Sequence, residues 1–121
     1  MIGIGVDVVE IERFRVSLRR TPTMRDRLFT PSELEYVAPQ ADPVPSLAAR
    51  FAAREAVMKA LGVGIGAFGF HDVWVERAPS GAPSLAFAGR ARELSEQAGV
   101  MRWHVSLTHS DLVAVAYVVA E

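Results

Sequence analysis

Three ionisable side chains stand out because the residues around them are mostly apolar. Asp7 lies in "MIGIGVDVVEIERF", a stretch that otherwise has the composition of an interior strand. Glu55 and Lys59 lie four residues apart in "SLAARFAAREAVMKALG", which has the pattern of a helix. Burying a carboxylate without a partner is costly, so each acid needs a compensating charge. Oxygen ligands in small number are the way Mg²⁺ is usually held beside a phosphate.

The segment around Asp7 alternates between branched apolar residues and small or acidic ones, as a strand does. The apolar residues that share one face are Ile2, Ile4, Val6 and Val8. Asp7 shares the other face with Gly3 and Gly5. We expect the two glycines to leave empty space beside the carboxylate.

Glu55 and Lys59 allow two interpretations. At the i,i+4 spacing of a helix the two side chains can meet, and an exposed pair of this kind contributes only about 0.3–0.5 kcal/mol. Alternatively, Glu55 lies at the edge of the core-facing stripe and joins Asp7. Two adjacent carboxylates repel each other unless a divalent cation neutralises them. Spacing alone leaves both interpretations open.

Charge is distributed unevenly along the chain. Residues 13–27 contain six arginines and one acid, giving +5, and the remaining seven bases and thirteen acids give −6, for a net charge of −1. The six are Arg13, Arg15, Arg19, Arg20, Arg25 and Arg27. The block favours an anionic partner, although a solvated helix face would look the same. Lys59 is the single lysine among the thirteen basic residues.

Length and composition exclude several classes of protein. The 121 residues predict one domain, 1–121, and the absence of cysteine excludes zinc–thiolate sites, disulfides and thiol nucleophiles. No apolar run approaches the roughly 18 residues of a membrane span, and no secretory signal precedes the first strand. We expect a cytoplasmic protein with neither membrane nor nucleic acid as a partner.

Periodicity and turn residues predict an α+β fold in the order βαααββαββ. Thr30, Pro31 and Glu33 form a capping-box signature at the start of a short helix, and Gly62 ends the helix over 46–61. The other expected elements are a strand over 2–9, helices over 10–20 and 90–98, and strands over 71–77, 84–87, 103–110 and 112–120. The last strand is apolar throughout, so we expect it to be buried on both faces.

Two further features carry little weight by themselves. The glycine-rich "GVGIGAFG" follows a helix and lacks the GK[ST] ending of a phosphate-binding loop, so a helix cap followed by a turn is the simpler interpretation. His109 closes the penultimate strand, where a lone histidine is more often structural than catalytic. No serine has a nucleophile-elbow pattern.

Three segments together resemble the signature blocks of the 4′-phosphopantetheinyl transferases, in particular their short bacterial group. They are "GIGVDVVEIERF", "RFAAREAVMKALGVGIG" and "HVSLTHSDLVAVAYVV", and "RLFTPSELEY" and the "SGAP" turn also fit. The similarity runs essentially end to end. It implies a mostly antiparallel sheet packed against a long central helix, and subunits assembled as a homotrimer with active sites at the interfaces.

The resemblance also implies an activity and a site. Phosphopantetheine would pass from coenzyme A to a serine of an acyl carrier protein, for fatty acid or polyketide synthesis. Asp7 and Glu55 would hold Mg²⁺, which Mn²⁺ can replace, and Lys59 would approach the diphosphate. With Lys59, the residues that would contact coenzyme A are Arg50, Gly62, Gly64, Gly66, Ser80, Gly81, Pro83 and His109. Arg13, Arg20 and Arg25 would dock the carrier protein.

One position departs from the family pattern, since Arg54 precedes Glu55 where the family usually has lysine. A guanidinium does not release a proton at neutral pH, so an acid–base role for residue 54 is doubtful. Our hypothesis for the general base is Glu55, acting directly or through a metal-bound water. The alternatives are a non-catalytic coenzyme A or nucleotide-binding module, another Mg²⁺-dependent phosphoryl-transfer enzyme or hydrolase, and a purely structural oligomerisation protein.

Overall fold

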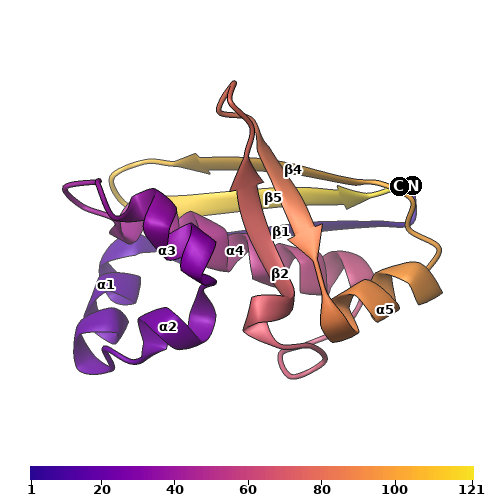
Figure 1. The fold of residues 1–121 in the computed structure, drawn as a ribbon, viewed down its shortest axis with the longest axis horizontal. Coiled ribbons are helices and arrows are strands. Elements are labelled where there is room, and N and C mark those ends of the chain that lie inside the picture. Colours follow the sequence, from indigo (N-terminus) through magenta and orange to yellow (C-terminus); the bar gives the residue numbers. More distant parts are fainter.

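Helices and two antiparallel sheets surround helix α4, which runs beneath the larger sheet (Figure 1). The computed structural model describes residues 1–121. The elements are β1 (Gly3–Glu10), α1 (Ile11–Arg20), α2 (Met24–Leu28), α3 (Pro31–Val37), α4 (Val44–Leu61), the 3₁₀ turn η1 (Phe70–Asp72), β2 (Val73–Arg77), β3 (Pro83–Phe87), α5 (Gly89–Gln97), β4 (Trp103–His109) and β5 (Val113–Ala120). The predicted α+β class with antiparallel sheets is confirmed. None of the helices is both long and apolar enough to cross a membrane.

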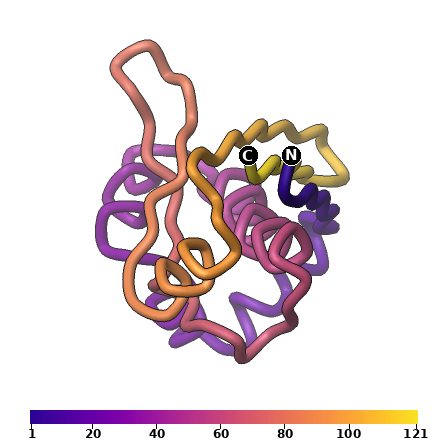
Figure 2. The backbone as a smooth tube through the Cα atoms, turned by 90° about the vertical axis from the view of Figure 1, so that its right-hand side faces the viewer, coloured from indigo at the N-terminus to yellow at the C-terminus, as the bar shows by residue number.

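The larger sheet has the strand order β1-β5-β4, and all its pairs are antiparallel. Pairing therefore joins the two ends of the chain, with Gly3 opposite Ala120. Figure 2 shows the termini side by side, and the β2–β3 hairpin projecting away from the rest of the chain. The hairpin turn contains Gly81 at φ 88°, and the Arg77 guanidinium donates to the Gly81 carbonyl at 2.6 Å.

The glycine face of β1 packs directly against the backbone of α4. A Cβ added to Gly5 would lie 1.9 Å from the Ala56 carbonyl oxygen, and one added to Gly3 would lie 2.0 Å from that of Ala60. The expectation of empty space beside Asp7 is therefore wrong, because the helix occupies that space. The glycines instead let a strand and a helix approach within backbone contact, which brings the middle of β1 close to the middle of α4.

The opposite face of the sheet is apolar and open. The β1 residues Ile4, Val6 and Val8 are exposed and stand opposite Val119, Tyr117 and Val115 of β5. Tyr117 is 43% exposed, whereas its neighbours Ala116 and Val118 are fully buried. The expectation that the last strand is buried on both faces is thus wrong for a single chain, because only the face toward α4 is covered.

Helix α4 is buried on nearly every side. It begins two residues before the predicted start and ends, as predicted, at Gly62 in the left-handed conformation at φ 71°. Between Leu47 and Ala60 the residues that are not fully buried are Phe51, Glu55 and Lys59. This four-residue spacing places them on one stripe of the helix. The stripe is the part of α4 that solvent and ligands can reach.

The capping box at Thr30 is confirmed, with Thr30 Oγ1 accepting from the Glu33 amide and the Glu33 carboxylate accepting from the Thr30 amide. Helix α2 was not predicted. It contains five residues, which is too few to show helical periodicity. The imidazole of His71 in η1 contacts the carbonyl of Asp26 in α2 at 2.7 Å, a tertiary contact that sequence periodicity does not reveal.

Replacing Gly5 with alanine should destabilise the protein by at least about 3 kcal/mol, because overpacking against a backbone atom cannot be relieved by a rotamer change. Urea unfolding followed by circular dichroism measures the loss. Gly64→Ala is the matched control, since a Cβ there meets nothing within 4 Å and should change stability by no more than about 0.5 kcal/mol. Equal effects from both substitutions would contradict the close packing of β1 on α4.

Candidate functional site

The close approach of β1 and α4 brings Asp7 and Glu55 to one cavity of about 490 Å³. The cavity is half apolar, and its other lining residues are Val8, Val9, Glu10, Arg13, Phe14, Ser17, Met24 and Phe51. Phe51 stacks against Phe14 of α1 with ring centroids 5.4 Å apart, which forms an aromatic wall. The cavity therefore combines three carboxylates, those of Asp7, Glu10 and Glu55, with an aromatic wall.

Lys59 pairs with Asp7, not with Glu55. Its ammonium donates to the Val6 carbonyl at 2.9 Å and to Asp7 Oδ1 at 3.2 Å. The i,i+4 ion pair that the spacing allowed is not formed. The hydrogen bond to the Val6 carbonyl holds the amine beside β1, and 55% of the Lys59 side chain remains exposed to solvent. The ammonium can therefore contact a ligand while it stays beside the carboxylates.

Glu55 is half-buried and has no ion-pair partner. Burial raises the pKa of its carboxyl group, the charge of Asp7 raises it further, and the charge of Lys59 lowers it. The carboxylate form is thus disfavoured in the protein alone and would be favoured by a cation. No cluster of three or more acidic, histidine or cysteine side chains is placed to hold a metal, so Asp7 and Glu55 would be the protein's contribution to such a site.

Arg50 lies in a second cavity, of about 530 Å³, bounded by α3, α4 and the β2–β3 hairpin. The residues that line it are Ser32, Tyr36, Arg50, Val75, Glu76, Arg77, Ala78 and Pro79.

The Arg50 guanidinium lies 4.8 Å from the centre of the Tyr36 ring, and that of Arg77 lies 6.0 Å from it. Burial lowers the pKa of Arg50, and the charge of Arg77 lowers it further. The buried Arg50 Nε has no hydrogen-bond partner. Two cations, one acid and an unpaired donor give this cavity a net charge of +1, which favours an anionic ligand; we call it the anion cavity.

Comparison with known proteins identifies the family of this chain. A family model described as the 4′-phosphopantetheinyl transferase superfamily matches residues 3–117. The chain belongs to that superfamily. A protein of Streptomyces avermitilis named holo-[acyl-carrier-protein] synthase is 50% identical over 122 residues, which cover 100% of this chain and 98% of the relative.

Solved structures of the same name share the fold of this superfamily member. The holo-[acyl-carrier-protein] synthase of Neisseria meningitidis matches with a TM-score of 0.91 and 32% identity, over 100% of this chain and 98% of that one. The holo-(acyl-carrier-protein) synthase of Bacillus anthracis, described in complex with CoA (3′,5′-ADP), matches with a TM-score of 0.82 and 31% identity, over 98% and 95% of the two chains.

The remaining residues that were expected to contact coenzyme A lie outside both cavities of this superfamily member. Gly62, Gly64 and Gly66 are exposed in the loop that follows α4. His109 is exposed at the end of β4. The turn with Ser80, Gly81 and Pro83 is next to Pro79, which lines the Arg50 cavity. A single chain therefore gathers Asp7, Glu55 and Lys59 at one place and Arg50 with the base of the hairpin at another.

The basic block divides into paired and unpaired arginines. Arg15 makes a bidentate pair with Asp42 at 2.8 and 2.9 Å and also contacts Glu12, so its charge is used within the chain. Arg13, Arg20 and Arg25 are exposed and form no ion pair. Arg13 lies at the carboxylate cavity itself. The unpaired arginines thus extend from the cavity along α1 to α2.

Sequence reasoning missed Tyr36 and Arg77 of the anion cavity and a buried ion pair beside it. Tyr36 and Arg77 line the anion cavity, and a lone tyrosine and a strand-end arginine gave no signal. Glu33 and Arg54 are buried together, with side chains 0% exposed. The capping box had already accounted for Glu33, and Arg54 was considered only for proton transfer. The available signal was that Arg54 lies among the alanines Ala52, Ala53 and Ala56 of its helix, all of which are buried.

Replacing Glu55 with glutamine should stabilise the metal-free protein at pH 7. The raised pKa means that the folded protein binds more protons than the unfolded chain, so stability is lost as pH rises from the unfolded value of about 4.3 through the folded one. The gain in melting temperature should be largest at pH 7 and should shrink toward pH 4. Calorimetry in a chelator-containing buffer measures it. Glu93→Gln, which removes an exposed acid paired with Arg90, should bring no such gain. A pH-independent effect of Glu55→Gln would contradict the interpretation.

Proposed function

We infer that this chain transfers 4′-phosphopantetheine from coenzyme A to a serine of apo-acyl carrier protein and releases 3′,5′-ADP. The observation that carries this inference is the pairing of Asp7 with Glu55 in one cavity beside Lys59, in a chain that matches holo-[acyl-carrier-protein] synthases along its whole length. Asp7, Glu55 and Lys59 are all present, so the residue types that this phosphate chemistry needs are available.

We propose that Asp7 and Glu55 hold Mg²⁺, with Mn²⁺ as a substitute. The raised pKa of Glu55 supports this proposal because two close carboxylates without a cation are mutually destabilising. Two carboxylates with room for water and phosphate oxygens suit the octahedral oxygen coordination of Mg²⁺. When bound, the ion would neutralise the diphosphate of coenzyme A and stabilise the leaving 3′,5′-ADP.

The side chains of the cavity then have distinct roles in the transfer. The serine oxygen attacks the phosphorus that carries pantetheine, and the bond from that phosphorus to the oxygen of 3′,5′-ADP breaks. We propose Glu55 as the base that takes the serine proton, directly or through a water molecule. Lys59, held by the Val6 carbonyl, stabilises the negative charge on the diphosphate.

We propose that Arg50 and the hairpin turn at Ser80, Gly81 and Pro83 receive the 3′-phosphoadenosine portion. Arg50 and Phe51 are consecutive on α4, so their side chains point about 100° apart, and the cavities they line face different sides of the helix. A ligand that contacts both kinds of cavity would therefore bind between two subunits, at the carboxylate cavity of one and the Arg50 cavity of the other. His109 and the exposed glycine loop, which line neither cavity, would contribute to a neighbour's site.

We propose a homotrimer on the same grounds. The face formed by Ile4, Val6, Val8 and Tyr117 is apolar and exposed in one chain, and exposed apolar patches of this kind are typical of interfaces. Association through it would cover the second face of β5. The mass of the protein in solution distinguishes one copy from three. We place the enzyme in the cytoplasm, in fatty acid or polyketide synthesis.

Incubating apo-acyl carrier protein with coenzyme A, with and without Mg²⁺, tests the function directly. Mass spectrometry should show a gain of one phosphopantetheine that requires the metal. Asp7→Asn and Glu55→Gln should each lower the rate by at least about a hundredfold, because an acid–base group alone contributes roughly 10²–10⁴-fold, while circular dichroism stays native. No mass gain together with calorimetric binding of coenzyme A would establish the binding-module alternative. Full activity of Glu55→Gln would remove its role as base.

The unpaired arginines should determine affinity for the carrier protein. Replacing Arg20 and Arg25 with glutamine should raise the Michaelis constant for the carrier protein and weaken its dependence on salt, because exposed charges are screened over about 8–10 Å at ordinary ionic strength. The Michaelis constant for coenzyme A should not change. Arg90→Gln on α5, away from α1, is the control and should leave both constants unaltered. Salt-independent kinetics of the wild-type protein would contradict electrostatic docking.

A further inference from the structure

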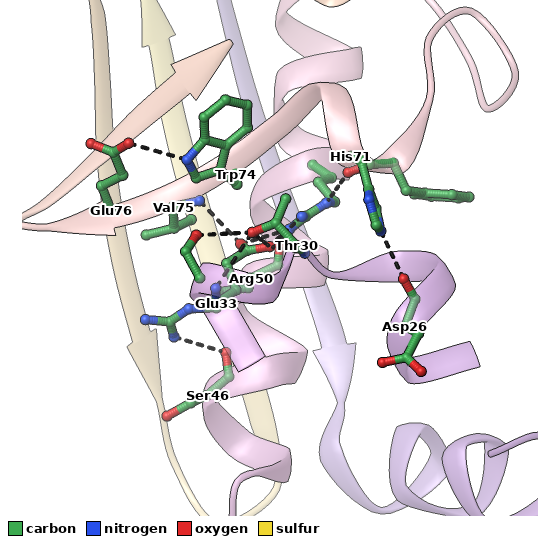
Figure 3. Close-up of polar contacts among 12 residues, drawn as sticks. Asp26, Thr30, Glu33, Ser46, Arg50, His71, Trp74, Val75 and Glu76 are labelled. Carbon is green, nitrogen blue, oxygen red and sulfur yellow. Dashed lines mark hydrogen bonds and ion pairs between the residues drawn. The ribbon is translucent and has the colours of Figure 1, made fainter. Parts of the chain in front are cut away.

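A fully buried ion pair joins α3 to α4 beside the anion cavity. The Glu33 carboxylate and the Arg54 guanidinium are bonded through both oxygens and both terminal nitrogens, with Nη1 3.0 Å from Oε2. Figure 3 shows the polar contacts that converge on Glu33. Because both side chains are 0% exposed, neither can touch a ligand. Their effect on any ligand must come through the residues they hold.

Each partner is also bonded to the backbone of a segment that lines the anion cavity. Glu33 Oε2 accepts from the Val75 amide of β2 at 3.1 Å. Arg54 Nη1 donates to the Arg50 carbonyl at 3.2 Å, and Arg54 Nε donates to the Phe70 carbonyl at 2.7 Å. Glu33 itself lies on α3, three residues before Tyr36. One ion pair therefore ties together α3, α4 and β2, the three elements that form the cavity.

Neither cationic side chain of the cavity is hydrogen-bonded to another element, since Arg77 donates to Gly81 within its own hairpin and Arg50 donates within its own helix. The Arg50 guanidinium donates to the Ser46 carbonyl of its own helix at 3.1 Å. The one aromatic ring that it contacts is that of Tyr36, on α3. Arg77 reaches the same ring from the hairpin. The separation of the two guanidinium groups, which repel each other, thus depends on how α3, α4 and β2 are spaced. That spacing is what the buried pair sets.

We infer that Glu33 and Arg54 are positioning residues that hold Arg50, Tyr36 and Arg77 in the arrangement that selects the 3′-phosphate of coenzyme A. This inference rests on the proposed function for the identity of the ligand. It gives a role to the buried guanidinium at position 54. The planar group can bond Glu33, Phe70 and Arg50 at once, whereas an ammonium has a single nitrogen.

The test compares coenzyme A with 3′-dephospho-coenzyme A in the full chain. In the neutral double variant E33Q/R54M no unpaired charge is left buried, so the fold should survive. We expect its Michaelis constant for coenzyme A to rise about tenfold, its kcat to stay within about threefold, and its preference for coenzyme A over the dephospho form to be largely lost. The double variant R90M/E93Q, which removes an exposed pair on α5, is the matched control and should behave as wild type.

Two further measurements keep the outcome decisive. If E33Q/R54M does not fold, E33D is used, because shortening the acid separates it from Arg54 or Val75 while the charges remain. A folded variant that keeps the wild-type preference for the 3′-phosphate overturns the inference. This holds even if the kcat and the melting temperature of the variant both fall, because such losses would show a structural role alone. Calorimetric titration with coenzyme A and with its 3′-dephospho form reports the same selection without turnover. If the wild-type protein transfers nothing, the proposed function fails while this binding comparison still decides the inference.

Discussion

The contact between β1 and α4 is the constraint on which the rest of the structure depends. Gly3 and Gly5 allow the strand to lie against the carbonyls of Ala56 and Ala60, and no larger residue would fit there. This contact places Asp7 beside the one open stripe of α4. The same contact turns the branched residues of β1, Ile4, Val6 and Val8, away from α4. The contact that brings Asp7 to the cavity therefore also leaves an apolar face of the sheet exposed.

The protein uses its carboxylates in two opposite ways. Glu33 is saturated, since its oxygens accept from Arg54 and from the amides of Thr30 and Val75, and it contributes to architecture. Glu55 is half-buried, has no ion-pair partner and has a raised pKa. A buried acid with every bond satisfied holds elements together, whereas an incompletely paired acid at a cavity is available for a ligand.

Much of the fold was accessible from the sequence because periodicity, caps and turns are local. The strand at Asp7, the capping box at Thr30 and the end of α4 at Gly62 were predicted on that basis. Helix α2 was too short for a pattern. The role of Gly3 and Gly5 was misread, because a missing side chain is visible in sequence but the atom that fills its space is not. Likewise, the pairing of Lys59 with Asp7 crosses between elements that no spacing rule connects.

Strand order has a consequence for how the protein is made. β5 is the middle strand of its sheet, with β1 on one side and β4 on the other. During synthesis β1 therefore has no hydrogen-bonding neighbour until residues 113–120 have emerged, which is a contact of very long sequence separation and hence slow to form. Both Asp7 and Glu55 are present as soon as α4 has been synthesised, but β1, which carries Asp7, is held before β5 emerges only by its packing on α4. The pair of acids is therefore held by a complete sheet only after β5 has paired with β1.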